Sequence, residues 1–175
     1  SCNETKRYRI GVSQCSSDVW REQMNDEMRR EATFSKNIDL DFRCGHDNNA
    51  LQAAQIDSLV KEGVDLLIVS PSEEVALTPA VEAAYRKGIP VILVDRRIRS
   101  DAYTAFVGAD NRAIAHDAGM LIANRMKGKG TVAEFAGTLE STAGQQRHEG
   151  FTKAMADYPG INVLPPIRAG WDGLQ

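Results

Sequence analysis

The chain has 175 residues, a formal net charge of −3, 26% charged residues and 42% hydrophobic residues, a composition typical of a globular domain. No apolar stretch approaches the length of a membrane-spanning helix. Basic residues gather in nothing larger than isolated pairs, so the sequence gives no reason to expect nucleic acid as a partner.

The first part of the chain alternates short apolar runs with amphipathic stretches. Asp47 or Asn48 is expected to cap one helix, which Gly63 ends, and Gly88 is expected to end the next. Consecutive parallel strands need a crossover connection, so this alternation predicts a doubly wound parallel α/β sheet. The predicted strands are residues 8–13, 39–43, 64–69, 89–94 and 102–108.

The same pattern begins again after the fifth strand. Asp110 and Asn111 are expected to cap a helix bearing Ile114, Ala118, Leu121 and Ile122. Two strands and two helices are few for an independent core. We therefore interpret residues 1–109 as a first α/β lobe and residues 110–175 as the beginning of a second lobe, and we expect a longer parent chain. Around the helix at 142–158, the predicted strands are 131–135 and 161–167.

Asp95 and Arg96 follow the buried run at 89–94 and carry the strongest functional signal. In open α/β sheets, ligands lie beyond the carboxyl ends of the strands. A carboxylate next to a guanidinium suits a polyhydroxylated molecule, whose hydroxyls both donate and accept hydrogen bonds. The alternative is a structural ion pair or a helix cap.

Aromatic residues and cysteines leave further alternatives open. Trp20 begins a stripe, with Met24, Met28 and Ala32, that predicts the inner face of a helix, so Trp20 belongs either to the core or to a ligand site. Trp171 lies in a glycine-rich turn typical of a recognition residue.

The three cysteines lack the spacing of a zinc site. The sequence does not decide whether Cys15 and Cys44 form a disulfide.

Enzyme signatures of the α/β class are absent from the sequence. Residues 11–16 do not match the G-x-G-x-x-G that a dinucleotide site needs, and the glycines at 128 and 130 precede a strand instead of a helix. No G-x-S-x-G elbow occurs, and the histidines show no ligand spacing. We therefore expect no catalytic activity, no metal and no cofactor.

Five segments, taken in order, resemble the periplasmic sugar-binding proteins of the ribose-binding type, whose fold is shared by the effector domains of LacI-type repressors. The chain most resembles the sensor domains of hybrid two-component systems in gut Bacteroidetes. This resemblance implies a type I periplasmic-binding fold in which two lobes close on a monosaccharide. The segments are IGVS at 10–13, GVDLLIVSP at 63–71, IPVILVDR at 89–96, VGADN at 107–111 and RHEGF at 147–151.

The resemblance also implies ligand-binding residues. One departure is Val19, which stands where the family often has a stacking aromatic residue, so the sugar preference is expected to differ. Asn111 is a candidate contact in addition to its capping role. The full set of candidates is Ser17, Trp20, Asp95, Arg96, Asn111, Arg147 and Trp171.

The predicted function is that of a periplasmic sensing domain linked to a membrane-bound histidine kinase module. The alternatives are a solute-binding protein of a sugar ABC transporter and the effector domain of a LacI-type repressor. A homodimer is left open. Export is expected both from the family and from Cys2, whose polar surroundings resemble what a cleaved export signal leaves behind.

Overall fold

Five parallel strands form one sheet in the order β2-β1-β3-β4-β5, in a computed structural model that describes residues 6–168. The chain divides into two compact units, Ser1–Gly108 and Ala109–Gln175, and this sheet belongs to the first. The predicted doubly wound α/β fold is confirmed. The strands are β1 (Tyr8–Gln14), β2 (Ile38–Cys44), β3 (Leu66–Ser70), β4 (Val91–Val94) and β5 (Ala105–Val107).

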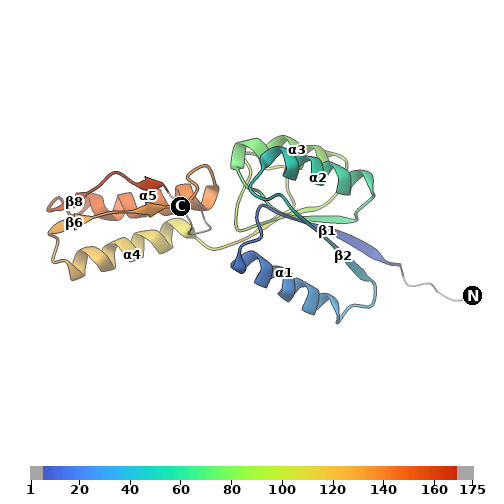
Figure 1. Cartoon of the computed structure of the whole chain (residues 1–175), viewed down its shortest axis with the longest axis horizontal. Coiled ribbons are helices and arrows are strands. Elements are labelled where there is room, and N and C mark those ends of the chain that lie inside the picture. The colour runs from blue at the N-terminus through green and yellow to red at the C-terminus, as the bar shows by residue number, and fades with distance from the viewer. Residues whose placement is uncertain (1–5, 169–175) are drawn as a thin grey trace, which may run out of the picture. The chain divides into compact units, whose positions relative to one another are not determined.

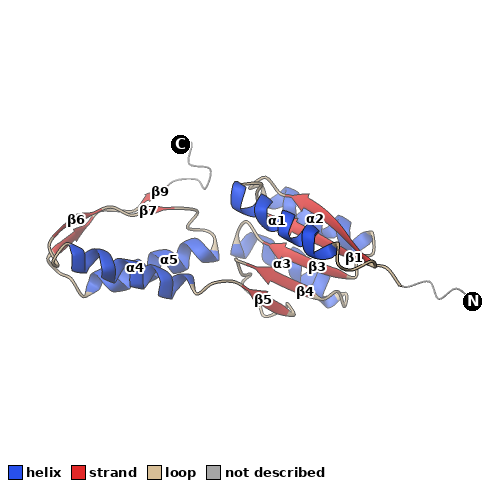
Figure 2. Ribbon diagram, turned by 90° about the horizontal axis from the view of Figure 1, so that it is seen from below, coloured by secondary structure: helices blue, strands red, loops and turns tan. Residues whose placement is uncertain are grey.

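Three helices cover the two faces of this sheet. Helix α1 (Val19–Ala32) lies on one face, and α2 (Asn49–Lys61) and α3 (Glu74–Arg86) lie on the other (Figure 1). The Asn48 side chain accepts a hydrogen bond from the backbone N–H of Leu51 and begins α2. Figure 2 shows the same layers with the strands in red.

The main hydrophobic core lies between the sheet and the pair α2 and α3. Gly11 of β1 sits at its centre, where an added Cβ would be 3.0 Å from both Leu59 and Leu67. A larger residue there would push apart two side chains that are already close-packed. The buried members are Ile56, Leu59, Val64, Leu67, Val69, Leu77, Val81, Ala84, Val91, Leu93 and Ile98.

The contact of α1 with the sheet is more polar than the sequence predicts. Arg21 and Asn25 are the buried residues of this helix, and Gln14 of β1 donates to Asn25 Oδ1 at 2.8 Å. Trp20 is 55% exposed, so its assignment to the inner stripe is wrong. A stripe beginning at Arg21 has the same four-residue spacing, and the polar groups at the end of β1 supply partners for it.

Up to residue 168, the second unit consists of two packed helices and two short parallel two-stranded sheets. Helices α4 (Asn111–Arg125) and α5 (Thr142–Ala156) pack through glycines, since a Cβ on Gly150 would lie 2.1 Å from the carbonyl oxygen of Arg112. This close approach explains the glycine in the RHEGF segment. Ile114, Leu121 and Ile122 are more than 40% exposed on α4.

Each strand predicted in the second unit is interrupted. Strands β6 (Gly130–Val132) and β8 (Ile161–Val163) pair with each other, as do β7 (Phe135–Ala136) and β9 (Ile167–Arg168). Residues 165 and 166 are both proline and cannot donate to a ladder. Continuous strands over 131–135 and 161–167 were therefore wrong, although the pairing continues on both sides of the interruption.

Candidate functional site

The candidate site lies at the carboxyl ends of β1, β3 and β4. In the strand order 2-1-3-4-5, the chain connections change direction between β1 and β3. Open sheets of this topology bind ligands at that switch point. Polar segments follow all three strands there, at residues 15–18, 70–72 and 95–96.

Asp95 holds an unusual backbone conformation directly after β4. Its φ angle is 66°, in the left-handed region. The N–H of Arg96 donates to the carbonyl of Val94 at 2.7 Å, the i to i+2 hydrogen bond of a γ-turn. The N–H of Asp95 itself donates to the carbonyl of Val107 at 2.8 Å, so β5 fixes the turn. Strained non-glycine residues of this kind gather at ligand sites.

The Asp95 carboxylate lies among positive charges and remains partly accessible. Nη2 of Arg21 is 3.3 Å from Asp95 Oδ2, and Nε of Arg96 is 3.9 Å from the same oxygen. The Asp95 side chain is 19% exposed, whereas the two arginine side chains are 3% and 5% exposed. The accessible charged group of this trio is therefore the carboxylate.

Arg96 is held by the turn that follows β3. Its Nη1 donates to the carbonyl of Ser72 at 3.0 Å. Gln52, which is fully buried, accepts from the N–H of Ser72 at 3.0 Å and donates to the carbonyl of Ser70 at 3.0 Å, so it fixes the shape of that turn. Burial lowers the pKa of Arg96 from its ordinary value, and the guanidinium nevertheless remains charged.

Arg21 belongs to the same polar cluster, and the sequence did not identify it. Its Nε donates to Ser16 Oγ at 3.2 Å, and its Nη1 donates to Ser70 Oγ at 3.0 Å. An arginine on an otherwise hydrophilic helix is usually solvated. The one available signal was its helical spacing with Asn25, which places both residues on the side facing the sheet.

Asp18 anchors the start of α1 beside this cluster. It accepts hydrogen bonds from the N–H of Arg21 at 3.0 Å and from Ser16 Oγ at 2.6 Å. Burial opposes ionisation of this carboxyl, but these hydrogen bonds outweigh that effect and lower the pKa of Asp18 below its ordinary value. The helix start is thus both capped and charged.

The remaining candidates of the first unit lie at the exposed rim of α1. Ser17 is exposed, Val19 is 86% exposed, and Trp20 is 55% exposed. The Arg21 guanidinium carbon lies 5.2 Å from the centroid of the Trp20 ring. The ring therefore offers an accessible face beside the polar cluster.

In the second unit, two predicted residues meet. Nε of Arg147 on α5 donates to Oδ1 of Asn111 at the start of α4, at 3.0 Å. Asn111 is 3% exposed, while Arg147 is exposed. Asp110 caps α4 by accepting from the N–H of Ala113 at 3.0 Å. The predicted residue Trp171 lies outside the described residues.

Residues 6–168 show neither a metal site nor a disulfide nor a membrane-spanning helix. No group of three or more histidine, cysteine or acidic residues there could hold a metal ion. Cys15 and Cys44 are free thiols, so no disulfide joins them. No described helix combines the length and the apolar character that crossing a membrane requires.

Comparison with known proteins identifies the class to which this fold belongs. Residues 10–175 match the periplasmic binding protein domain family, and the chain belongs to that family. The chain is 30% identical over 171 residues to the xylitol-binding protein of Mycolicibacterium smegmatis, covering 97% of this chain and 48% of the relative. It is 29% identical over 143 residues to the ribose import binding protein of Bacillus subtilis, covering 73% and 47%.

Solved structures give the same class. The fructose-binding periplasmic domain of the hybrid two-component system BT1754 superposes with a TM-score of 0.92 at 48% identity, covering 94% of this chain and 55% of that one. The binding protein of a Shewanella arabinose ABC transporter superposes with a TM-score of 0.85 at 28% identity, covering 93% and 55%. This chain therefore spans about half the length of the relatives it matches.

Proposed function

We propose that this chain is part of a periplasmic domain that binds a neutral monosaccharide and reports it to a hybrid two-component kinase. Membership of the periplasmic binding protein family and the 48% identity to a fructose-binding sensor domain support this proposal. The observation that carries it is the Asp95 carboxylate, which a strained turn presents at the switch point of the sheet.

The chemistry of Asp95 suits sugar hydroxyls. Both guanidinium contacts reach Oδ2, and Oδ1 accepts no hydrogen bond from the described residues. Oδ1 therefore keeps its acceptor capacity for a ligand hydroxyl. A hydrogen bond to a charged carboxylate contributes about 1.5–3 kcal/mol.

The charges of the cluster favour a neutral ligand. The guanidiniums of Arg21 and Arg96 lie with the carboxylates of Asp95 and Asp18, so two positive charges meet two negative ones. A phosphate or a carboxylate on the ligand would add a negative charge that this balanced cluster of the first unit does not compensate. We therefore infer a sugar or a polyol without a charged group.

Further contacts are proposed from the family resemblance. Trp20 offers an aromatic face for the C–H side of a sugar ring, and Ser17, which is also exposed, is a proposed polar contact. Asn111, Arg147 and Trp171 are proposed contacts from the second unit. In this proposal residues 1–109 form a first lobe, and residues 110–175 begin a second.

The parent protein defines the alternatives. A solute-binding protein of a sugar ABC transporter is favoured by the arabinose and ribose relatives, whereas the sensor relative has the higher identity. A kinase module encoded downstream in the same reading frame would indicate a sensor domain instead of a transporter binding protein. A DNA-binding module encoded upstream would indicate a repressor. The domain itself is proposed to be non-catalytic, periplasmic and capable of forming a homodimer in the kinase.

Calorimetric titration of the full-length protein tests the proposal. D-fructose, D-ribose, L-arabinose and xylitol form the neutral panel, and D-fructose 6-phosphate and D-gluconate form the charged panel. We expect binding within the neutral panel alone. Tighter binding of a charged compound, or no heat from any neutral one, would contradict the proposal.

Asp95→Asn is the matched variant for the same titration. It keeps the shape of the side chain but removes the charge, and we expect an affinity loss of about a hundredfold or more, equivalent to one or two charged hydrogen bonds. Asp101→Asn, at an exposed position of the β4–β5 connection, is the control and should bind like the wild type. Equal affinity of the Asp95→Asn variant would remove Asp95 from the site.

A further inference from the structure

Arg21 connects the ends of three strands through one side chain. Its guanidinium donates to Ser16 after β1, to Ser70 at the end of β3 and to Asp95 after β4. The Arg21 side chain is 3% exposed, so it is shielded from a ligand that approaches from solvent. Its contacts are with groups around the candidate site instead.

The same residue also links the polar and the aromatic parts of the candidate site. Its guanidinium carbon lies 5.2 Å from the ring centroid of Trp20. Ser16 Oγ accepts from Arg21 Nε and donates to Asp18 at the start of α1. Hydrogen bonds in such a chain strengthen one another in a buried setting. Arg21, Ser16 and Asp18 therefore form one rigid support.

We propose that Arg21 is a positioning residue of the sugar site: it fixes the Asp95 carboxylate through Oδ2, directs Oδ1 toward the ligand, and holds the Trp20 ring beside it. This inference rests on the proposed function, because it assigns Arg21 a role in that same site. Arg21 acts through Asp95 and Trp20 and does not itself contact the sugar.

The shape of guanidinium is what this role requires. Arg21 uses Nε, Nη1 and Nη2 for three different acceptors, and a planar fork holds these donors at fixed angles. The ammonium of a lysine carries the same charge but is a single centre on a flexible stem. Lysine should therefore keep the charge balance while losing the fixed direction of Asp95.

The test compares Arg21→Lys with Ser70→Ala in the full-length protein, using the neutral sugar panel and melting temperatures. Ser70→Ala removes one anchor of the guanidinium and keeps Arg21 and Asp95. We expect Arg21→Lys to lower affinity about tenfold or more and Ser70→Ala to lower it severalfold, since a charged hydrogen bond is lost or loosened in each. Arg30→Lys, on the exposed side of the same helix, is the control and should change neither the affinity nor the melting temperature.

A double-mutant cycle supplies a readout that does not need the ligand. The melting temperatures of Arg21→Gln, Asp95→Asn and the double variant should be non-additive, because each single change takes one of two ionic partners away from a buried or half-buried charge. Additive shifts would show that the two side chains are not coupled and would overturn the inference.

The outcomes separate this inference from the function on which it rests. Wild-type sugar binding with unchanged affinity in Arg21→Lys would overturn the role of Arg21 and leave the sugar site standing. Absence of wild-type binding across the panel would overturn both, and coupling between Arg21 and Asp95 would then describe a structural ion pair. Weakened binding with retained folding and strong coupling would support the positioning role.

Discussion

At the scale of single residues, Asp95 has two properties that can be tested separately: the left-handed conformation of its backbone and the negative charge of its side chain. The residue keeps a φ of 66° while its carboxylate meets Arg21 and Arg96. Aspartate and asparagine tolerate this region because their side chains bond locally, whereas other L-residues pay about 1–2 kcal/mol. Charge and backbone shape can thus be removed one at a time.

Asp95→Ala should therefore be less stable than Asp95→Asn, by about 1 kcal/mol in the free energy of unfolding. Both variants lose the carboxylate, and alanine additionally strains the turn. Urea unfolding at pH 7 measures the difference. The same pair of substitutions at Asp101, which lacks a positive φ, should differ less in the free energy of unfolding. An equal difference at the two positions would contradict the role of the turn.

The sequence indicated Asp95 and Arg96 but not Arg21, for a physical reason. The end of an apolar run marks the end of a buried strand, so the residues that follow it can be placed at the carboxyl end of the sheet. The side of a helix that faces a sheet is marked only by apolar spacing, and α1 buries Arg21 and Asn25 instead. Their burial depends on partners contributed by β1, β3 and β4, which no local pattern in α1 encodes.

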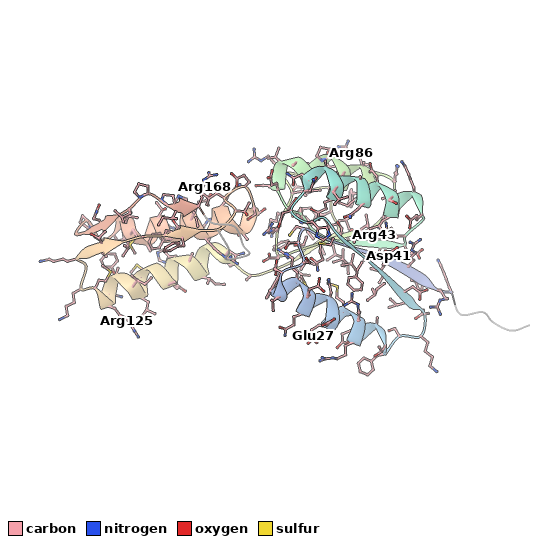
Figure 3. All side chains as sticks on the ribbon, viewed as in Figure 1. Glu27, Asp41, Arg43, Arg86, Arg125 and Arg168 are labelled. Carbon is pink, nitrogen blue, oxygen red and sulfur yellow. The ribbon has the colours of Figure 1, made fainter. Side chains whose placement is uncertain are left out.

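At the scale of elements, a network of charges ties the edge strand β2 to its neighbours. Asp41 of β2 accepts from Nε of Arg43 at 2.8 Å and also pairs with Arg9 of β1. Arg43 reaches Glu62 beyond α2 at 3.1 Å, and Figure 3 marks Asp41 and Arg43 on the strand. Charged side chains on an edge strand also discourage pairing with a second sheet.

The hydrogen bond from Arg43 lowers the pKa of Asp41 from 3.8 to about 2. Because the folded state lowers this pKa, the carboxylate stabilises the fold above about pH 4, and the effect is lost as the pH falls through 2. Asp41→Asn should lower the free energy of unfolding by about 1 kcal/mol at pH 7, after allowance for solvent screening, and by almost nothing at pH 2.

Urea unfolding of the Asp41→Asn variant at both pH values measures this effect. Asp39→Asn is the matched control, since Asp39 lies on the same strand, pairs with Arg7 and is 54% exposed. Its substitution should cost less at pH 7. A cost for Asp41→Asn that is the same at pH 2 and pH 7 would contradict the assignment of the network to the carboxylate charge.

Element boundaries followed from the sequence where caps and glycines mark them. Asn48 and Asp110 accept the hydrogen bonds that begin α2 and α4, and Gly63 and Gly88 adopt the positive φ angles that follow α2 and α3. The interruption of the second-unit strands was not predicted, because apolar residues continue on both sides of it. The prolines at 165 and 166 were the available signal.

At the scale of the whole molecule, the two units differ in how much they bury. The core cluster of the first unit contains Leu59, Leu67 and Leu93, all with 0% exposure, among its buried residues. The cluster of the second unit is limited to Ala123, Ala154, Met155 and Ile161 within the described residues. Amide protection depends on burial of this kind.

Hydrogen exchange of the 175-residue chain should therefore be slowest in β1 and β3 and much faster in β7 and β9. β1 and β3 are interior strands, whereas β7 and β9 pair through two residues each. Mass spectrometry of peptides from the two regions measures the difference. Similar protection of β3 and β9 would contradict the difference in core size.

The γ-turn at Asp95 also constrains how the protein can diversify. Asparagine or glycine at position 95 would keep the backbone shape and discard the charge, while most other residues would distort the strand end. Ser17, Val19 and Trp20 carry no such restriction, since none of them has a positive φ and all are exposed. Homologues with a different ligand preference should thus carry substitutions at the rim of α1 and keep position 95 unchanged.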